Sequence, residues 1–149
     1  MTRGEALIDV EDHVGFHLAF PVKDLEGTMA FYGGLLGLRQ GRIGADWVDY
    51  DLCGHQISAH VMPEACRPRE AHDVDGDDVP VRHFGLVVRW EVWLRLAERL
   101  RADGARFLIE PHVRFQGQPG EQATFFVEDP SGNALEFKAF QDPARLFAR

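Results

Sequence analysis

Hydrophobic and polar residues alternate along several short stretches of the chain, which predicts half-buried β-strands. Residues 14–22 show this first, with Phe16, Leu18 and Phe20 on one side and small or polar residues on the other. A helix is predicted next, because Asp24 can cap a segment whose apolar residues follow helical spacing. Three more short strands are predicted at residues 38–43, 47–52 and 55–62. The first part of the chain therefore reads βαβββ.

The same order of signals returns in the second half of the chain. Residues 82–90 read as a strand, and apolar residues at helical spacing follow until Gly104. Three further strands are predicted at residues 106–115, 122–128 and 133–140. We therefore predict an α+β fold built from a duplicated βαβββ module, at residues 14–62 and 81–140, whose two sheets complete a common core.

Residues 63–80 form the predicted connection between the two modules. The segment PEACRPREAHDVDGDDVP is polar, contains prolines and lacks periodicity, so we expect an irregular linker rather than a strand or helix. Its acidic run, Asp73 to Asp78, is expected to be a solvated loop, because an EF-hand would need a terminal glutamate at a set offset. Residues 1–149 are then one domain.

Composition narrows the class of protein. With 149 residues, 45% of them hydrophobic, the chain can bury a core of its own. A net charge of -8 argues against a nucleic-acid partner, which calls for a clustered positive field. No segment approaches the ~20 apolar residues that cross a bilayer, and no apolar run follows the first basic residues, so we expect a cytoplasmic protein without a membrane partner. Cys53 and Cys66 fit no metal or disulfide framework and are expected to be reduced thiols.

Three residues far apart in the sequence form the candidate chemistry. His17, His83 and Glu136 each lie on the polar face of a predicted strand, at equivalent places in the repeat. A buried imidazole or carboxylate without a partner is costly, and a shared cation removes that cost. Two imidazoles and one carboxylate can hold one side of a divalent metal and leave the other open. We therefore predict that these three residues bind one metal ion.

Other polar residues on these faces are candidates for contact with a substrate. His60 is the candidate acid or base for proton transfer, although it also fits a solvent-facing histidine at a strand end. Gln56 and Lys138 are candidates for binding substrate oxygens, and Lys138 fits a solvated charge at the rim equally well. These assignments stay open at the level of sequence.

Three segments carry a resemblance to a known family. The turn DPSGNALEF, residues 129–137, resembles the ending of domains in the vicinal oxygen chelate superfamily, which includes glyoxalase I, extradiol dioxygenases, fosfomycin-resistance enzymes and bleomycin-resistance proteins. Residues 17–38 resemble its opening strand and helix, and RHFGLVV resembles its third landmark. The resemblance covers about residues 14–140.

The resemblance implies paired βαβββ modules around a divalent metal, with His17, His83 and Glu136 at the ligand positions. It also implies a homodimer, and leaves open whether the modules pair within one chain or across chains. Aligning Gly54 with Gly132 in the repeat places Ser58 where glyoxalase I carries a fourth ligand. A shifted register would bring His60 there instead.

Three ligands leave an open face that suits Fe(II), because a catecholate can occupy two sites and dioxygen the third. Mn(II), Zn(II), Ni(II) and Co(II) are also accepted by such ligands. Residues 115–140 resemble small predicted extradiol dioxygenases, so our leading hypothesis is a ring-cleaving dioxygenase of a catechol-like substrate. The alternatives are a glyoxalase-like lyase or isomerase, a fosfomycin-resistance-like thiol transferase, and a bleomycin-resistance-like binding protein, although proteins of that last kind lack the three ligands.

Overall fold

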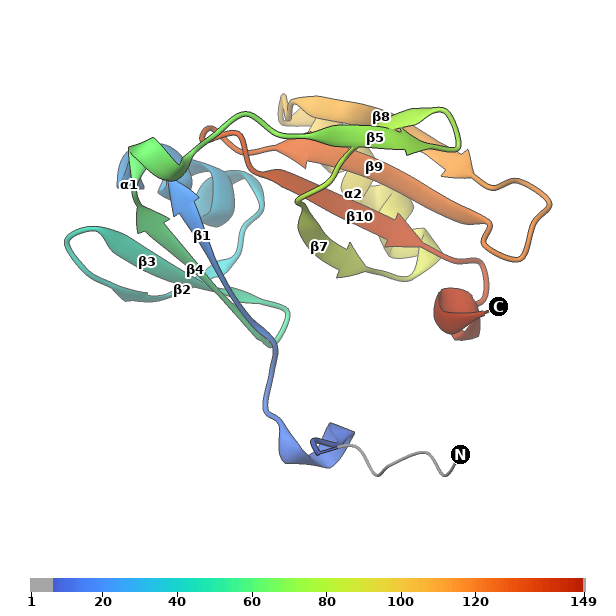
Figure 1. Cartoon of the computed structure of the whole chain (residues 1–149), viewed down its shortest axis with the longest axis horizontal. Coiled ribbons are helices and arrows are strands. Elements are labelled where there is room, and N and C mark those ends of the chain that lie inside the picture. The colour runs from blue at the N-terminus through green and yellow to red at the C-terminus, as the bar shows by residue number, and fades with distance from the viewer. Residues whose placement is uncertain (1–6, 149) are drawn as a thin grey trace.

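Two four-stranded sheets make up most of the computed structural model, which describes residues 7–148 (Figure 1). The first sheet has the strand order β1 (His17–Val22), β4 (His55–Val61), β3 (Trp47–Leu52) and β2 (Arg39–Ile43). The second has the order β7 (Phe84–Val87), β10 (Ala134–Ala139), β9 (Gln122–Glu128) and β8 (Phe107–Arg114). In each sheet the first pair is parallel and the others are antiparallel. The predicted α+β fold of repeated βαβββ units is confirmed.

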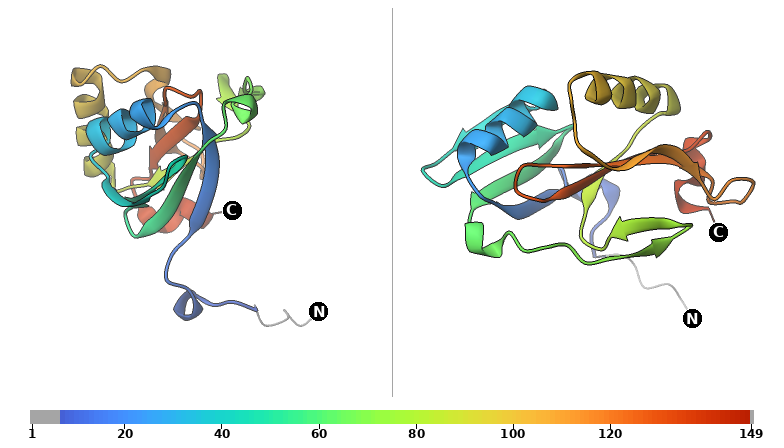
Figure 2. Two further views of the ribbon diagram at one scale, coloured as in Figure 1. Left: turned by 90° about the vertical axis from the view of Figure 1, so that its left-hand side faces the viewer. Right: turned by 90° about the horizontal axis from the view of Figure 1, so that it is seen from above.

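A helix connects the first two strands of each unit. In the first unit, α1 (Leu25–Met29) continues into a π-helical turn (Ala30–Leu35), and the Asp24 side chain caps its start by accepting a hydrogen bond from the Gly27 amide. In the second unit the helix is α2 (Trp90–Ala102). Both helices lie on one side of the sheets (Figure 2). Short 3-10 turns occupy Val10–Asp12, Pro63–Ala65 and Pro143–Phe147.

One hydrophobic core joins the two units. Its buried residues come from the π-helical turn after α1, from α2 and from the apolar faces of both sheets, and Leu25 of α1 packs against them. The rings of Phe20 in β1 and Phe84 in β7 meet across the junction of the sheets, with centroids 5.0 Å apart. Burial of this continuous apolar surface fixes one unit against the other.

The turn between β9 and β10 adds polar ties between the units. The Tyr32 hydroxyl, in the first unit, donates to the carboxylate of Asp129 at 2.8 Å. The side-chain amide of Asn133 donates both to Asp129 and to the carbonyl of Pro21 in β1, each at 2.9 Å. These hydrogen bonds set the position of β10 relative to β1.

The connection between the units is more ordered than the sequence predicts. Ala71–Val74 forms β5 and Asp77–Pro80 forms β6, paired as an antiparallel hairpin, so the expectation of an irregular linker is wrong for these residues. Asp75 and Gly76 make the turn with positive φ angles of 49° and 86°. Asp-Gly between two strands is the sequence signal for such a turn. It was not recognised because the acidic residues on both sides of it are typical of a solvated loop.

The hairpin β5–β6 covers part of the second sheet, on the face opposite α2 (Figure 2). Buried Val79 of β6 packs there with Ile109, Phe126 and Ala134. This is the face that also carries Glu136, because Ala134 and Glu136 are two residues apart in β10. In residues 7–148 no helix has the length and apolar character needed to span a membrane.

Candidate metal centre

The parallel strands of the two sheets pair in the same way, so positions in the two units can be matched. Ala19 of β1 lies opposite Ser58 of β4, and Gly85 of β7 lies opposite Glu136 of β10. Ser58 therefore occupies in the first sheet the place that Glu136 occupies in the second. His17 and His83 stand two residues before Ala19 and Gly85, so they too are equivalent.

The turns that precede β4 and β10 agree with this alignment. Gly54 and Gly132 both adopt the left-handed region, with φ angles of 91° and 88°. In the resulting register His60 matches Lys138, one strand period beyond Ser58. The strand pairing therefore excludes the alternative alignment of the two units in which His60 would be the equivalent of Glu136.

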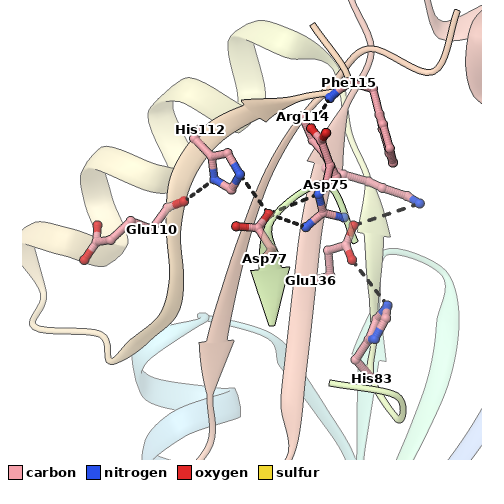
Figure 3. A network of polar contacts seen from close by, with 9 residues as sticks. Asp75, Asp77, His83, Glu110, His112, Arg114, Phe115 and Glu136 are labelled. Carbon is pink, nitrogen blue, oxygen red and sulfur yellow. Dashed lines mark hydrogen bonds and ion pairs between the residues drawn. The ribbon is translucent and has the colours of Figure 1, made fainter. Parts of the chain in front are cut away.

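His83 directly precedes β7 and faces Glu136 on the neighbouring strand (Figure 3). Its Nε2 lies 3.3 Å from Glu136 Oε2, and its Nδ1 lies 2.7 Å from the carbonyl oxygen of Pro80. A carbonyl can only accept, so Nδ1 carries a hydrogen and donates it. The ring edge of His83 also packs on Phe126, with centroids 5.0 Å apart. This outer support is the kind that orients a metal-binding histidine and leaves Nε2 for the metal.

The two groups shift each other's protonation. Burial alone would raise the pKa of Glu136, which is 6% exposed, but the hydrogen bond from His83 and the charges of Lys138 and Arg114 outweigh burial and lower that pKa. The hydrogen bond to Glu136 raises the pKa of His83 and outweighs the opposite effect of burial. The metal-free pair is therefore an imidazolium and a carboxylate over a widened range of pH.

Gly85 allows the close approach of β7 to β10 at this pair. A Cβ atom at Gly85 would lie 1.6 Å from the carbonyl oxygen of Glu136, a distance at which the two atoms would clash. The absence of a side chain thus brings the strand that follows His83 against the strand that carries Glu136. Lys138, the next residue on the same face of β10, places its Nζ 4.0 Å from Glu136 Oε1.

His17 is not part of this cluster in a single chain. It is exposed at the start of β1, in the first sheet, where it pairs with Gln56 of β4. Within residues 7–148 of one chain, no three histidine, cysteine or acidic side chains are placed so that they could hold a metal ion. The fold therefore brings His83 and Glu136 together and leaves His17 apart.

The first sheet holds a buried acid that sequence reasoning missed. Asp49 of β3 is 6% exposed and lies opposite Ser58 in the register. The Ser58 hydroxyl donates to Asp49 Oδ1 at 2.6 Å, and the Gln56 amide donates to Oδ2 at 3.1 Å. The alternation in WVDYDL could have revealed it, because Asp49 is a charged residue on the strand face opposite to that of Val48 and Tyr50.

The predicted substrate contacts are divided between the sheets. Lys138 stands beside Glu136, whereas Gln56 and His60 are exposed on β4. A cavity of about 530 Å³ opens beside His83 at the junction of the sheets, with Phe20 and Asn133 among its lining residues. A small molecule fits a space of this size.

The sequence matches a family model described as the Glyoxalase/Bleomycin resistance protein/Dioxygenase superfamily over residues 15–137. A solved structure described as a glyoxalase/bleomycin resistance protein/dioxygenase from Alicyclobacillus acidocaldarius is 33% identical, with 89% of this chain and 96% of that chain covered and a TM-score of 0.74. No curated protein matches the chain.

More distant structures share the fold. The fosfomycin resistance protein FosX from Listeria monocytogenes is 21% identical, with 87% of this chain and 95% of that chain covered and a TM-score of 0.65. A lactoylglutathione lyase from Agrobacterium tumefaciens is 16% identical, with 90% and 96% covered and a TM-score of 0.60. At these identities the likeness concerns the fold alone.

Proposed function

The chain belongs to the glyoxalase/bleomycin resistance protein/dioxygenase superfamily, and on that basis we propose that it is an enzyme with a single divalent metal. In this proposal His17, His83 and Glu136 hold the metal, and the substrate is a small molecule that binds through neighbouring oxygens. The observation that carries the proposal is the contact between His83 and Glu136, with Pro80 fixing the imidazole. A buried carboxylate facing an oriented imidazole fits a metal of this class.

We place His17 in the same site through a second copy of the chain. On the polar face of the first sheet, His17, Gln56 and His60 are exposed in the single chain. In a dimer with twofold symmetry, the first sheet of each copy can face the second sheet of the other, and two equal sites result. Each site then contains His17 from one copy and the remaining two ligands from the other.

The chain's own residues then have distinct roles in the chemistry. A bound divalent metal would lower the pKa of a substrate hydroxyl and hold two neighbouring oxygens. Neutral His83 offers Nε2 while donating Nδ1–H to Pro80, and Lys138 offers a positive charge to an anionic substrate oxygen. His60 is the proposed group for moving a proton, because its exposed imidazole shares a polar face with His17.

The reaction that we propose is ring cleavage of a catechol-like substrate by an Fe(II) dioxygenase. Its support is the open side of the ligand set, because Ser58 stands at the fourth position and its hydroxyl is engaged by Asp49. Zn(II) or Ni(II) chemistry of the glyoxalase kind would use a further strong ligand at that place. Lyase, isomerase and thiol-transferase reactions remain the alternative proposals, and a bleomycin-resistance-like binding protein without turnover is a further one.

Oxygen consumption separates these functions. Protein purified without oxygen and loaded with Fe(II) is expected to consume dioxygen when catechols are added, and Glu136→Gln is expected to abolish the uptake. Anaerobic conversion of a hemithioacetal by the same protein would favour the glyoxalase reaction instead. Tight binding of a small molecule that persists after the metal is removed by chelation, without oxygen uptake or product, would favour a binding protein.

Metal binding is expected to weaken as the pH falls through the raised pKa of His83. Coordination needs the neutral imidazole, so below that pKa binding displaces a proton, and apparent affinity falls by about tenfold per pH unit for each proton displaced. The metal-free fold has the opposite dependence, because protonated His83 stabilises it at low pH and this contribution is lost as pH rises through the folded-state pKa. Calorimetric titration with Mn(II) in two buffers of different ionisation enthalpy measures the protons released. An affinity that does not change from about pH 5.5 to about pH 8 would contradict this.

A further inference from the structure

The hairpin β5–β6 contacts His83 directly and contacts Arg114, whose guanidinium lies near Glu136. We propose that this hairpin is the outer support of the metal centre, and that Asp77 in it is a positioning residue that keeps the buried guanidinium of Arg114 away from Glu136. This inference rests on the proposed function, because the metal centre is part of that proposal. It also assigns a role to the connecting segment beyond joining the two units.

The end of the hairpin supports His83. Pro80, the last residue of β6, accepts the hydrogen bond from His83 Nδ1 at 2.7 Å. Its neighbour Val79 packs against Phe126, and the ring of Phe126 in turn packs against the imidazole. The hairpin thus fixes both the tautomer and the tilt of His83.

The start of β6 supports Arg114. This arginine is 4% exposed, and its Nε and Nη2 donate to Asp77 Oδ2 at 3.1 and 2.9 Å (Figure 3). His112 Nε2 lies 2.8 Å from the same oxygen. The Asp75 carboxylate accepts a hydrogen bond from the Phe115 amide at 2.8 Å, which ties the hairpin turn to the end of β8.

A buried guanidinium must have an anionic partner, because an unpaired charge in a protein interior is costly. In Figure 3 the guanidinium of Arg114 lies between the carboxylates of Asp77 and Glu136, and its charge contributes to lowering the pKa of Glu136. If Asp77 lost its charge, Glu136 would be the carboxylate left for Arg114. A guanidinium bound there would compete with the metal for the same oxygens.

Metal affinity tests this role. Asp77→Asn is expected to bind Mn(II) ~10- to 100-fold more weakly than the unaltered protein, the range typical of lost outer-shell support. The double variant Asp77→Asn with Arg114→Gln removes the competing cation and is expected to recover most of the affinity. Asp78→Asn is the matched control, because Asp78 is an exposed neighbour in the same strand and its loss changes the net charge equally. Thermal unfolding of each variant shows whether the fold is retained.

Two results would overturn the role of Asp77. One is an Asp77→Asn variant that binds Mn(II) as tightly as the control, and the other is a double variant as weak as Asp77→Asn alone. A crystal structure of metal-free Asp77→Asn tests the same point without metal, since Arg114 is expected on Glu136 and a guanidinium that stays in place contradicts the proposal. Failure of the unaltered protein to bind Mn(II) would instead remove the metal centre itself.

Discussion

Replacing His83 by alanine is expected to weaken metal binding by more than about 100-fold, beyond the range seen for outer-shell partners, and to abolish turnover. The imidazole is one of three proposed protein ligands, and its Nε2 already faces the carboxylate of Glu136. Removing it leaves Glu136 without its hydrogen-bond partner, although Lys138 stays nearby. Anaerobic equilibrium dialysis against Fe(II), followed by elemental analysis, measures the loss directly.

His72→Ala is the control for this variant. His72 is an exposed histidine of β5 that makes no side-chain hydrogen bond or ion pair within residues 7–148, so its removal changes the composition equally. The control is expected to keep full metal content and activity. Full metal occupancy of His83→Ala would contradict the ligand assignment, whatever its activity.

A heterodimer of His17→Ala and His83→Ala chains is expected to bind about half the metal of the unaltered dimer, while each variant alone binds almost none. If each site takes His17 from one copy and His83 with Glu136 from the other, one site of the heterodimer keeps all three ligands. The second site loses both histidines. Two affinity tags allow the heterodimer to be isolated, and elemental analysis gives its metal content.

The same experiment decides between the two ways of pairing the units. If each chain supplied all three ligands to its own site, both sites of the heterodimer would lack a histidine, and its metal content would fall to that of the variants. A heterodimer without metal would therefore contradict the shared site. Catechol-dependent oxygen uptake by the heterodimer is expected to follow the metal content.

Local patterns predicted most of the fold. The alternation in residues 14–22 gave β1, the cap at Asp24 gave the start of α1, and Gly104 follows the end of α2. These signals are local because strand period, helix spacing and capping depend on near neighbours. The hairpin β5–β6 was missed because polar residues at its surface positions concealed the Asp-Gly turn.

The site could be predicted only in part. His83 and Glu136 became candidates because each lies on the polar face of a predicted strand whose other face is apolar, and the fold brings them into contact. The link from Asp77 to Arg114 joins residues 37 positions apart, and the contact of His83 with Pro80 depends on the hairpin. A single sequence carries no signal for such pairings. In our proposal the place of His17 depends on a second chain, and the sequence left open whether the two units pair within one chain or across chains.

A crystal structure of the Mn(II)-loaded protein, with the metal located by anomalous scattering, tests the central claim most directly. The account predicts one metal peak per chain, in contact with His83 and Glu136 of one copy and with His17 of a second copy. A peak bound by other residues, or a dimer in which His17 lies far from the other two ligands, would contradict it.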